Sequence, residues 1–456
     1  MVEHADVVVL GMGPGGEDVA GRLAEDGLDV IGIEKQLVGG ECPYWGCVPS
    51  KMMIRAANLL AEARRIPGMA GAATVTPDWA PVAGRIRAEA TDNWDDKVAV
   101  DRFESKGGRF IRGAGHLAGP GTVSVGDRTI QASRAIVLAT GTTAAIPPVA
   151  GLADVPYWTN RHAIETADLP RSLIILGGGA IGVELSQVFA RFGVEVTVVE
   201  ALDRLLPVEE PEAGVLLADV LAGEGVTVHT GALATGVTYD GARFGVTLDG
   251  GRQLGGERLL VATGRRAELA TLGLDAVGID HNQRWLPVDG RLRAASGVWA
   301  VGDLTGAGAF THVAMYQAGI AVADILGQDP LPADYRALPR VTFSDPEVGS
   351  VGLSTAAAVA KGLRIRVGTS QIPRSARGWI HKTGNEGFIK LVEDAQRGVL
   401  VGATSAGPAG GEVLGLLTLA VHAEIPTGVL GRMIYAYPTF HRAVEDALRN
   451  LADLAS

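Results

Sequence analysis

The amino-acid sequence opens with the apolar run VVVLGMGPGG, which predicts a buried β-strand that ends in a glycine-rich turn. A helical pattern follows as far as Asp26, and a second short strand, DVIGIE, ends at Glu34. Strands of a parallel sheet are buried on both faces and therefore give continuous apolar runs of this kind. The first 34 residues thus predict one strand–helix–strand unit.

The same pattern recurs in the middle of the chain. The run SLIILGGGAIGVELSQVFARFGVEVTVVE repeats the strand, the glycine turn, the helix and a second strand, which closes at Glu200. The spacing of the glycines is identical in the two units: Gly11, Gly13 and Gly16 in the first, and Gly177, Gly179 and Gly182 in the second. Such glycines let a pyrophosphate approach a helix N-terminus, and an acid about 20 residues on accepts hydrogen bonds from a ribose. Two units of this kind predict two bound dinucleotides.

Three further patterns organise the rest of the chain. An apolar strand ends in the run Ala139-Thr140-Gly141, and the second glycine unit ends in a strand of the same type, LLVATGRR. The run GVWAVGD brings another strand to Gly302 and Asp303, before a helical stretch from His312 to Ile325. From Asp334 the pattern changes to β-branched runs and two final helices, without a nucleotide fingerprint. The length of 456 residues suggests roughly three domains.

Charge and hydropathy narrow the class of protein. The formal net charge is −11, which argues against nucleic acid or an anionic membrane as a partner. The sequence contains no apolar run of membrane-spanning length, and Glu3 and Asp6 make its start unlike a secretory signal. We therefore expect a cytoplasmic enzyme.

Both cysteines of the chain, Cys42 and Cys47, lie in one run, GGECPYWGCVPSK. A bridge between them would close a very short loop and contribute little to stability. Strain and exposure would make it easy to reduce, which suits a disulfide that cycles. The alternatives are two buried thiols or half of a zinc site, although zinc needs more ligands at matching spacing. No metal site is predicted.

Glu200 bears on the choice of nicotinamide cofactor. A carboxylate there binds the two ribose hydroxyls of NAD and repels the 2′-phosphate of NADP. Arg204 lies four residues further on and could approach a phosphate, but residues 201 and 202 are Ala and Leu. We expect NAD as the cofactor, with NADP less favoured.

Together these motifs resemble the class I pyridine nucleotide–disulfide oxidoreductases, the family of lipoamide dehydrogenase, glutathione reductase and mercuric reductase. The resemblance covers essentially the whole chain, because the cysteine run, both ATG runs, the Gly302–Asp303 pair and FSDPEVGSVG fall in family order. It implies an α/β fold with two Rossmann-like domains, for FAD and NAD, and a C-terminal α+β dimerisation domain. The implied domains are 1–150 for FAD and the redox disulfide, 151–275 for NAD(P)H, 276–333 for a central segment completing the FAD domain, and 334–456 for dimerisation.

The resemblance also assigns roles around the cysteines. Cys47 would be the thiol that faces the flavin, and Cys42 the interchange thiol that faces the substrate. Lys51 would lie near the flavin and pair with Glu184. A thiolate at Cys47 would be favoured by the start of a helix near Pro49 and by the nearby cation.

Other residues are assigned to the cofactors. Asp303 would bond the ribityl chain of FAD, and Glu34 the adenosine ribose. The remaining cofactor-binding residues implied are Gly11, Gly13, Pro14, Gly15, Gly16, Lys35, Gly40, Glu41, Lys51, Ala139, Thr140, Gly141, Gly177, Gly179, Ile181, Gly182, Glu200, Gly264, Gly302, His312, Val313 and Ala314.

The C-terminus departs from the family pattern. Members that handle dithiols end in a run resembling HPTxxE, whose His serves the partner subunit as general base and is oriented by the Glu. Here Tyr437 stands in place of the His and Arg442 in place of the Glu. A phenol is a poor proton shuttle at neutral pH, whereas imidazole titrates near it. His441 and Glu445, on one helical face, offer a shifted dyad, but we favour an ion pair at a surface or interface for them.

These considerations predict a flavoprotein that moves electrons from NADH through FAD to the Cys42–Cys47 disulfide and on to a small acceptor. Quinones, metal ions and activated disulfides are the acceptors expected. The alternatives are lipoamide-type dithiol oxidation with a compensating base, and a noncatalytic flavoprotein that senses redox state. A homodimer with a composite active site, including Tyr437, is implied by the resemblance.

Overall fold

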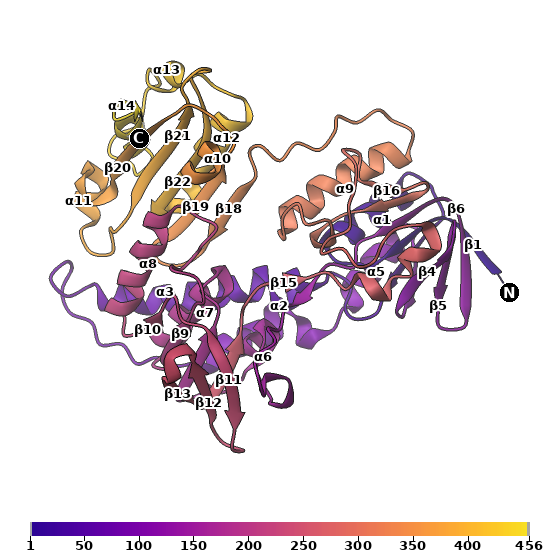
Figure 1. Cartoon of the computed structure of the whole chain (residues 1–456), viewed down its shortest axis with the longest axis horizontal. Helices are drawn as coiled ribbons and strands as arrows, with labels where there is room; N and C mark the ends of the chain where they lie inside the picture. Colours follow the sequence, from indigo (N-terminus) through magenta and orange to yellow (C-terminus); the bar gives the residue numbers. More distant parts are fainter. Residues whose placement is uncertain (1, 454–456) are drawn as a thin grey trace. The chain divides into compact units, whose positions relative to one another are not determined.

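The computed structural model describes residues 2–453, which form two compact units (Figure 1). The first unit comprises the chain up to Ser50, Ala83–Ala145 and Gly264–Asp334, and the second comprises Lys51–Val82, Ile146–Thr263 and the chain from Tyr335 onward. The division falls within helix α3 (Cys47–Arg64), whose first turn belongs to the first unit. The predicted domain boundaries at 150, 275 and 333 stay predictions.

The first unit is built on a sheet with the order β16-β17-β6-β1-β2-β3, to which β5 and then β4 are added at β6. The strands from β17 to β3 pair in parallel. Their bounds are β1 (Val2–Leu10), β2 (Val30–Glu34), β3 (Arg109–Arg112), β4 (Gly115–Gly119), β5 (Thr122–Val125), β6 (Arg128–Leu138), β16 (Arg293–Ala295) and β17 (Val298–Ala300). The two-residue strands β7 (Thr143–Ala144) and β15 (Arg265–Arg266) pair with each other, antiparallel, in a separate sheet.

The continuous apolar run of β1 follows from burial on both faces of this sheet. Val8 and Leu10 belong to one hydrophobic core, whereas Val7 and Val9 belong to another. Helices α1 (Pro14–Glu25) and α9 (Thr311–Ile325) pack together, and α9 begins one residue before the predicted start. The other helices with residues in this unit are α2 (Glu41–Trp45), α3, α4 (Ala80–Arg85) and α5 (Lys97–Ser105).

The second unit contains the repeated strand–helix–strand motif. Its parallel sheet has the order β10-β9-β8-β14, and a separate antiparallel sheet is formed by β11, β12 and β13. The bounds are β8 (Ser172–Leu176), β9 (Glu195–Val199), β10 (Thr227–His229), β11 (Ala234–Tyr239), β12 (Phe244–Leu248), β13 (Gln253–Gly256), β14 (Arg258–Val261), α6 (Asn160–Glu165), α7 (Ala180–Arg191) and α8 (Pro211–Gly223).

The C-terminal part forms a six-stranded antiparallel sheet with the order β18-β19-β22-β21-β20-β23 (Figure 1). Helix α12 packs against β19 and β22, and α14 against β20 and β21. A short helix, α13, lies between the two final helices that the sequence predicts. The bounds are β18 (Pro339–Thr342), β19 (Glu347–Gly352), β20 (Ile365–Gln371), β21 (Phe388–Asp394), β22 (Val399–Gly407), β23 (Ala452–Asp453), α10 (Thr355–Ala360), α11 (Ala376–His381), α12 (Gly410–His422), α13 (Thr427–Leu430) and α14 (Ala443–Arg449). Within residues 2–453, every helix is too short or too polar to cross a membrane.

The last glycine of each fingerprint is required by the packing of the helix on the strand. A Cβ atom added at Gly16 would lie 1.9 Å from the carbonyl oxygen of Gly11, and one at Gly182 would lie 1.9 Å from that of Gly177. Both obstacles are backbone atoms, which cannot yield as a flexible side chain can. Any side chain at these positions would therefore push the helix away from its strand.

We predict that Gly182→Ala destabilises the protein, because the new methyl group collides with the Gly177 carbonyl. The free energy of unfolding should fall by about 1–3 kcal/mol, the usual cost of overpacking. Thermal or urea unfolding of the purified variant measures this loss. The matched control is Gly179→Ala, where an added Cβ meets no atom within 4 Å. Equal losses for the two variants would contradict the prediction.

Candidate active site

Each glycine fingerprint ends at the start of a helix that has open space before it. Gly13 and Gly179 are the N-cap residues of α1 and α7. A Cβ added at Gly179 meets nothing within 4 Å, and one at Gly13 meets only the Cα of Gly40, at 4.0 Å. A side chain at these two positions would not collide with the rest of the chain, so packing alone does not require glycine there. The space fits a pyrophosphate, which the helix N-terminus would bind through its backbone N–H groups.

The first acidic residue of the fingerprint is tied to the glycine loop. One carboxylate oxygen of Glu34 accepts a hydrogen bond from the backbone N–H of Met12 at 2.8 Å. The other oxygen accepts one from the N–H of Gln36 at 2.7 Å. The carboxylate is therefore held at the end of β2, beside the open space in front of α1, which we call the cradle. A ribose hydroxyl can donate to its remaining lone pairs there.

Glu200 makes the same pair of contacts in the second unit. Its carboxylate oxygens accept from the backbone N–H groups of Gly178, at 2.6 Å, and Leu202, at 2.8 Å. The repeat predicted from the sequence thus extends to the hydrogen bonds of the acidic residue. The negative charge of Glu200 has a defined place at the end of β9.

Arg204 is bound by two acceptors of the chain itself. Its guanidinium donates to the carbonyl oxygen of Pro207 at 2.9 Å and to the carboxylate of Asp203 at 3.0 Å. A 2′-phosphate would have to draw Arg204 from these acceptors. Its engagement is consistent with the preference for NAD that Glu200 predicts.

The two ATG runs pack directly on the glycine loops. The N–H of Ala139 donates to the carbonyl of Leu10 at 2.7 Å, and a Cβ at Gly11 would lie 2.5 Å from the carbonyl oxygen of Ala139. In the second unit, a Cβ at Gly177 would lie 2.3 Å from the carbonyl oxygen of Ala262. Each run therefore forms one wall of a glycine loop.

The two cysteines lie on neighbouring short segments of the first unit. Cys42 belongs to α2, and Cys47 is the first residue of α3. Both are thiols here, and a hydrogen bond with Cys47, reinforced by burial, raises the pKa of the Cys42 thiol above its ordinary value. Among residues 2–453, no group of three or more His, Cys, Asp or Glu side chains is placed to hold a metal ion.

Sequence reasoning missed a hydroxyl group beside the redox sulfur. The Oγ1 atom of Thr311 lies 3.4 Å from the Sγ atom of Cys47, although the two residues are 264 positions apart. Thr311 is the first residue of the 15-residue helix α9, and Cys47 itself begins α3. Two helix N-termini and a hydroxyl group thus favour negative charge on this sulfur. The one signal in the sequence was a hydroxyl residue directly before His312.

The start of α9 also shows what His312 and Ala314 do. The His312 ring stacks on Phe310, with centroids 5.1 Å apart. Ala314 is 5% exposed, and its methyl group lies 3.1 Å from where a Cβ on Gly15 would be. Ala314 thus sets the distance between α9 and α1.

Asp303 belongs to a polar network that includes two residues the sequence analysis did not name. Thr142 donates to the Asp303 carboxylate at 2.9 Å, and Arg265 donates to the Thr142 hydroxyl at 2.7 Å. Burial raises the pKa of Asp303, and the Arg265 guanidinium, 3.9 Å away, opposes that shift. Thr142 and Arg265 each directly follow an ATG run, which is the signal that could have revealed them.

The remaining residues expected to contact cofactors lie in the same loops. They are Pro14 at the start of α1, Lys35 directly after β2, Gly40 and Glu41 at the start of α2, Thr140 and Gly141 after β6, Ile181 in the first turn of α7, Gly264 at the end of the second ATG run, Gly302 before Asp303, and Val313 in the first turn of α9. Their contacts with cofactors stay predictions.

The structure brings Lys51 and Glu184 together in the second unit. The Nζ atom of Lys51 donates to one oxygen of Glu184 at 2.9 Å, and the backbone N–H of Phe343 donates to the other at 2.8 Å. Lys51 Nζ also lies 4.5 Å from the centroid of the Phe343 ring. The position of this pair next to a flavin stays a prediction.

The C-terminal run places an arginine between a tyrosine and an acid. Tyr437 is 71% exposed, and the Arg442 guanidinium carbon lies 5.6 Å from the centroid of its ring. Within residues 2–453, Glu445 pairs with Arg442, at 2.9 Å, and with Arg449, not with His441. The nearest polar partner of His441 is the Thr439 hydroxyl, at 3.4 Å. The shifted dyad is therefore not assembled in this structure.

Comparisons with known proteins agree with these features. Residues 5–318 match the family model of the pyridine nucleotide-disulphide oxidoreductases, and residues 338–448 match that of the dimerisation domain of the same family. The dihydrolipoyl dehydrogenase of Chlorobaculum tepidum is 34% identical over 454 residues, which cover 97% of this chain and 96% of that protein.

Two solved structures share the whole fold. LpdA from Mycobacterium tuberculosis superposes with a TM-score of 0.85 at 28% identity, covering 98% of this chain and 99% of that one. A cysteine-to-serine variant of the HOCl-induced flavoprotein disulfide reductase RclA from Escherichia coli, in complex with Cu(II), superposes with a TM-score of 0.86 at 26% identity and the same coverage. The predicted fold class of two Rossmann-like domains and an antiparallel dimerisation domain is confirmed. This chain belongs to the pyridine nucleotide-disulphide oxidoreductases, a family of flavoprotein enzymes that bind FAD and NAD(P).

Proposed function

We propose that this protein is an NADH-dependent reductase that delivers electrons through FAD and the Cys42–Cys47 disulfide to a small acceptor. FAD, when bound, supplies the chemistry that links hydride transfer from NADH to the reduction of a disulfide. Hydride from NADH delivers two electrons and one proton, which convert the disulfide into one thiol and one thiolate, and this pair returns both electrons to the acceptor. The observation that carries the proposal is the redox run together with the replacement of the His–Glu pair by Tyr437 and Arg442.

The surroundings of the thiols support a division of labour between them. Cys47 lies at two helix N-termini and beside the Thr311 hydroxyl, so it is the sulfur suited to remain as thiolate. The pKa of the Cys42 thiol is raised by its hydrogen bond with Cys47. The raised pKa favours the protonated form of Cys42, which must give up its proton when it attacks an acceptor, because the thiolate is the nucleophile.

The polar groups around the glycine loops support the choice of cofactors. In the first unit, the cradle before α1, Glu34 and the Asp303–Thr142–Arg265 network would hold FAD. In the second, the cradle before α7 and the Glu200 carboxylate would hold NADH. The resemblance to the family implies that the Lys51–Glu184 pair would lie near the flavin.

The C-terminal run supports a small acceptor rather than a dithiol. The Tyr437 phenol faces solvent and has a guanidinium, not a carboxylate, against its ring. A guanidinium cannot accept a hydrogen bond from a base or balance the positive charge of a protonated base, as the carboxylate of the family pattern can. A quinone or a metal ion accepts electrons without a base aimed at Cys42, and the solved Cu(II) complex of RclA supports including a metal ion.

A homodimer is the assembly we propose. The match to the dimerisation domain supports it, as do apolar side chains that are exposed on this part of the chain, including Trp379 at 76% and Ile434 at 96%. A groove of about 430 Å³ on the same domain is lined by apolar residues together with Glu412 and His441. In the dimer, Tyr437 would belong to the partner subunit's site.

Spectroscopy of cysteine variants tests the proposed electron path. Limited reduction of the FAD-loaded protein should give a long-wavelength absorption band, because the Cys47 thiolate would lie beside oxidised flavin. Cys47→Ser should lose this band, whereas Cys42→Ser should retain it. The reverse pattern would exchange the two roles, and absence of the band from the unmodified protein would refute the path through the disulfide.

Steady-state kinetics tests the choice of nucleotide. We expect a higher kcat/KM with NADH than with NADPH, because the Glu200 carboxylate suits a free ribose diol and repels a phosphate. Glu200→Gln should narrow the difference. Arg204→Ala is the matched control and should leave the preference unchanged, because Arg204 is held by Asp203 and Pro207. A preference for NADPH would contradict this assignment.

The alternative function, dihydrolipoyl dehydrogenase activity, is supported by the 34% identity to such enzymes. The replacement of the family's His by Tyr437 gives the sharpest test between this alternative and the proposed function. Dihydrolipoamide oxidation should be slow while NADH-dependent quinone reduction persists, because general base catalysis is typically worth about 10²–10⁴-fold. The double variant Tyr437→His with Arg442→Glu should raise dithiol turnover. His441→Ala is the control, and it should have little effect. Rapid dihydrolipoamide turnover that His441→Ala abolishes would favour the shifted dyad.

A further inference from the structure

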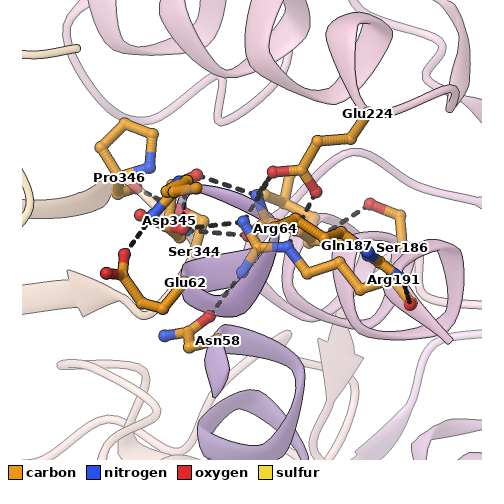
Figure 2. Close-up of polar contacts among 12 residues, drawn as sticks. Asn58, Glu62, Arg64, Ser186, Gln187, Arg191, Glu224, Ser344, Asp345 and Pro346 are labelled. Carbon is orange, nitrogen blue, oxygen red and sulfur yellow. Dashed lines mark hydrogen bonds and ion pairs between the residues drawn. The ribbon is translucent and has the colours of Figure 1, made fainter. Parts of the chain in front are cut away.

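The side chain of Arg191, the last residue of α7, is 2% exposed and bonded through all three guanidinium nitrogens (Figure 2). It forms two hydrogen bonds with Glu224, at 2.6 and 2.8 Å. Its other donors reach the Asn58 side-chain oxygen at 2.6 Å and the Asp345 carboxylate at 2.8 Å. The planar fork of the guanidinium thus fixes three separate chain segments relative to α7.

The loop between β18 and β19 is fixed by backbone as well as side-chain contacts. The N–H of Asp345 donates to the side-chain oxygen of Gln187, and the carbonyl oxygen of Asp345 accepts from the side-chain nitrogen of the same residue, both at 2.8 Å. The Asp345 carboxylate oxygen that binds Arg191 also accepts from Arg65 at 2.7 Å. Asp345 therefore has little freedom to move along α7.

The spacing of these contacts connects them to the Lys51–Glu184 pair. Glu184, Gln187 and Arg191 are three and four positions apart and so share one face of α7. The contact of Asn58 with Arg191 lies seven residues further along both helices than that of Lys51 with Glu184. We call this set of contacts the polar seam; its members are Lys51, Asn58, Arg65, Glu184, Gln187, Arg191 and the loop residues 343–345.

We propose that Arg191 is a positioning residue for the Lys51–Glu184 pair. By holding Asp345, Arg191 keeps the loop where the Phe343 N–H donates to one oxygen of Glu184. With that oxygen committed, the carboxylate has one orientation, in which its second oxygen meets Lys51 Nζ. The consequence for catalysis rests on the proposed function, in which Lys51 lies beside the flavin.

A purely structural role explains less of this arrangement. Well-packed apolar residues commonly replace a buried ion pair without loss of stability, so the charges of the polar seam are not needed merely to fill space. An apolar residue at position 191 would remove one of the contacts that hold Asp345 on α7 and leave its carboxylate with Arg65 alone, while Gln187 would still bind its backbone. The lysine side chain is flexible, so its position depends on the orientation of its carboxylate partner.

Chemical labelling of Lys51 tests the proposal directly. Trace acetylation of the FAD-loaded protein with acetic anhydride, read by peptide mass spectrometry, compares Lys51 with the exposed reference Lys97. In Arg191→Met, acetylation of Lys51 should rise severalfold, because the amino group is less firmly held against Glu184. Asp345→Asn is nearly isosteric and should give a smaller rise, which keeps the test available if Arg191→Met does not fold.

The control breaks a different ion pair in the same unit, one in which the acid is buried and the arginine is 40% exposed. Arg366 pairs with Glu393, which is fully buried, and neither belongs to the polar seam. Arg366→Met should lower stability but leave the acetylation of Lys51 unchanged. An equal rise in the control and in Arg191→Met would mean that general loosening of the unit exposes Lys51, and it would overturn the proposal.

Stopped-flow reduction of the flavin by NADH provides a second measurement. Arg191→Met should slow reduction by about tenfold through misplacement of Lys51, with little change in the Kd of NADH. In a Lys51→Met background the same substitution should cause no further loss, because Arg191 acts through Lys51. Additive losses, or unchanged acetylation of Lys51, would overturn the proposal. If Lys51→Met alone leaves reduction unchanged, the role of Lys51 beside the flavin fails, and the labelling still decides the role of Arg191.

Discussion

The contact on which the rest of the structure depends is the close approach of a helix to a strand through glycine, made once in each strand–helix–strand unit. At Gly16 and Gly182 the space for a Cβ atom is taken by a backbone carbonyl oxygen 1.9 Å away. This approach brings each helix N-terminus to the end of the sheet. The acids Glu34 and Glu200 then accept from backbone N–H groups of the glycine loops, so charge and helix dipole act at one place.

The redox chemistry is placed by the same architecture. The cysteine run follows the first unit directly, and a Cβ at Gly40 would lie only 2.9 Å from the Cα of Gly13. The segment that carries Cys42 and Cys47 therefore packs on the glycine loop. Helix α9, which packs on α1, brings Thr311 to the Cys47 sulfur. Electrostatics then distinguishes two chemically identical thiols, because Cys47 lies at helix N-termini, whereas a hydrogen bond with Cys47 and burial raise the pKa of Cys42.

The C-terminal sheet contributes geometry rather than nucleotide binding. Its loop at residues 343–345 reaches α7 and commits one oxygen of Glu184, which leaves the other for Lys51. Directly before its last helix, α14, Arg442 stands in place of the carboxylate that orients a base in the family pattern. Arg442 instead joins the Tyr437 ring to Glu445, and this contact uses the acid that a shifted dyad would need.

The sequence alone determined the features that are local in the chain. Apolar periodicity, glycine spacing and the cysteine run each lie within about 30 residues, and local sterics decide them. They predicted the two repeated units and the acids that close them, whereas the Lys51–Glu184 pair, 133 positions apart, and the loss of the His–Glu pair were expected only from the resemblance to the family. Only the tertiary structure decided the contacts of Thr311 with Cys47, of Arg265 with Thr142 and of Arg191 with Asp345. Those contacts join residues more than 100 positions apart, and they depend on how helices and loops pack, which no local pattern specifies.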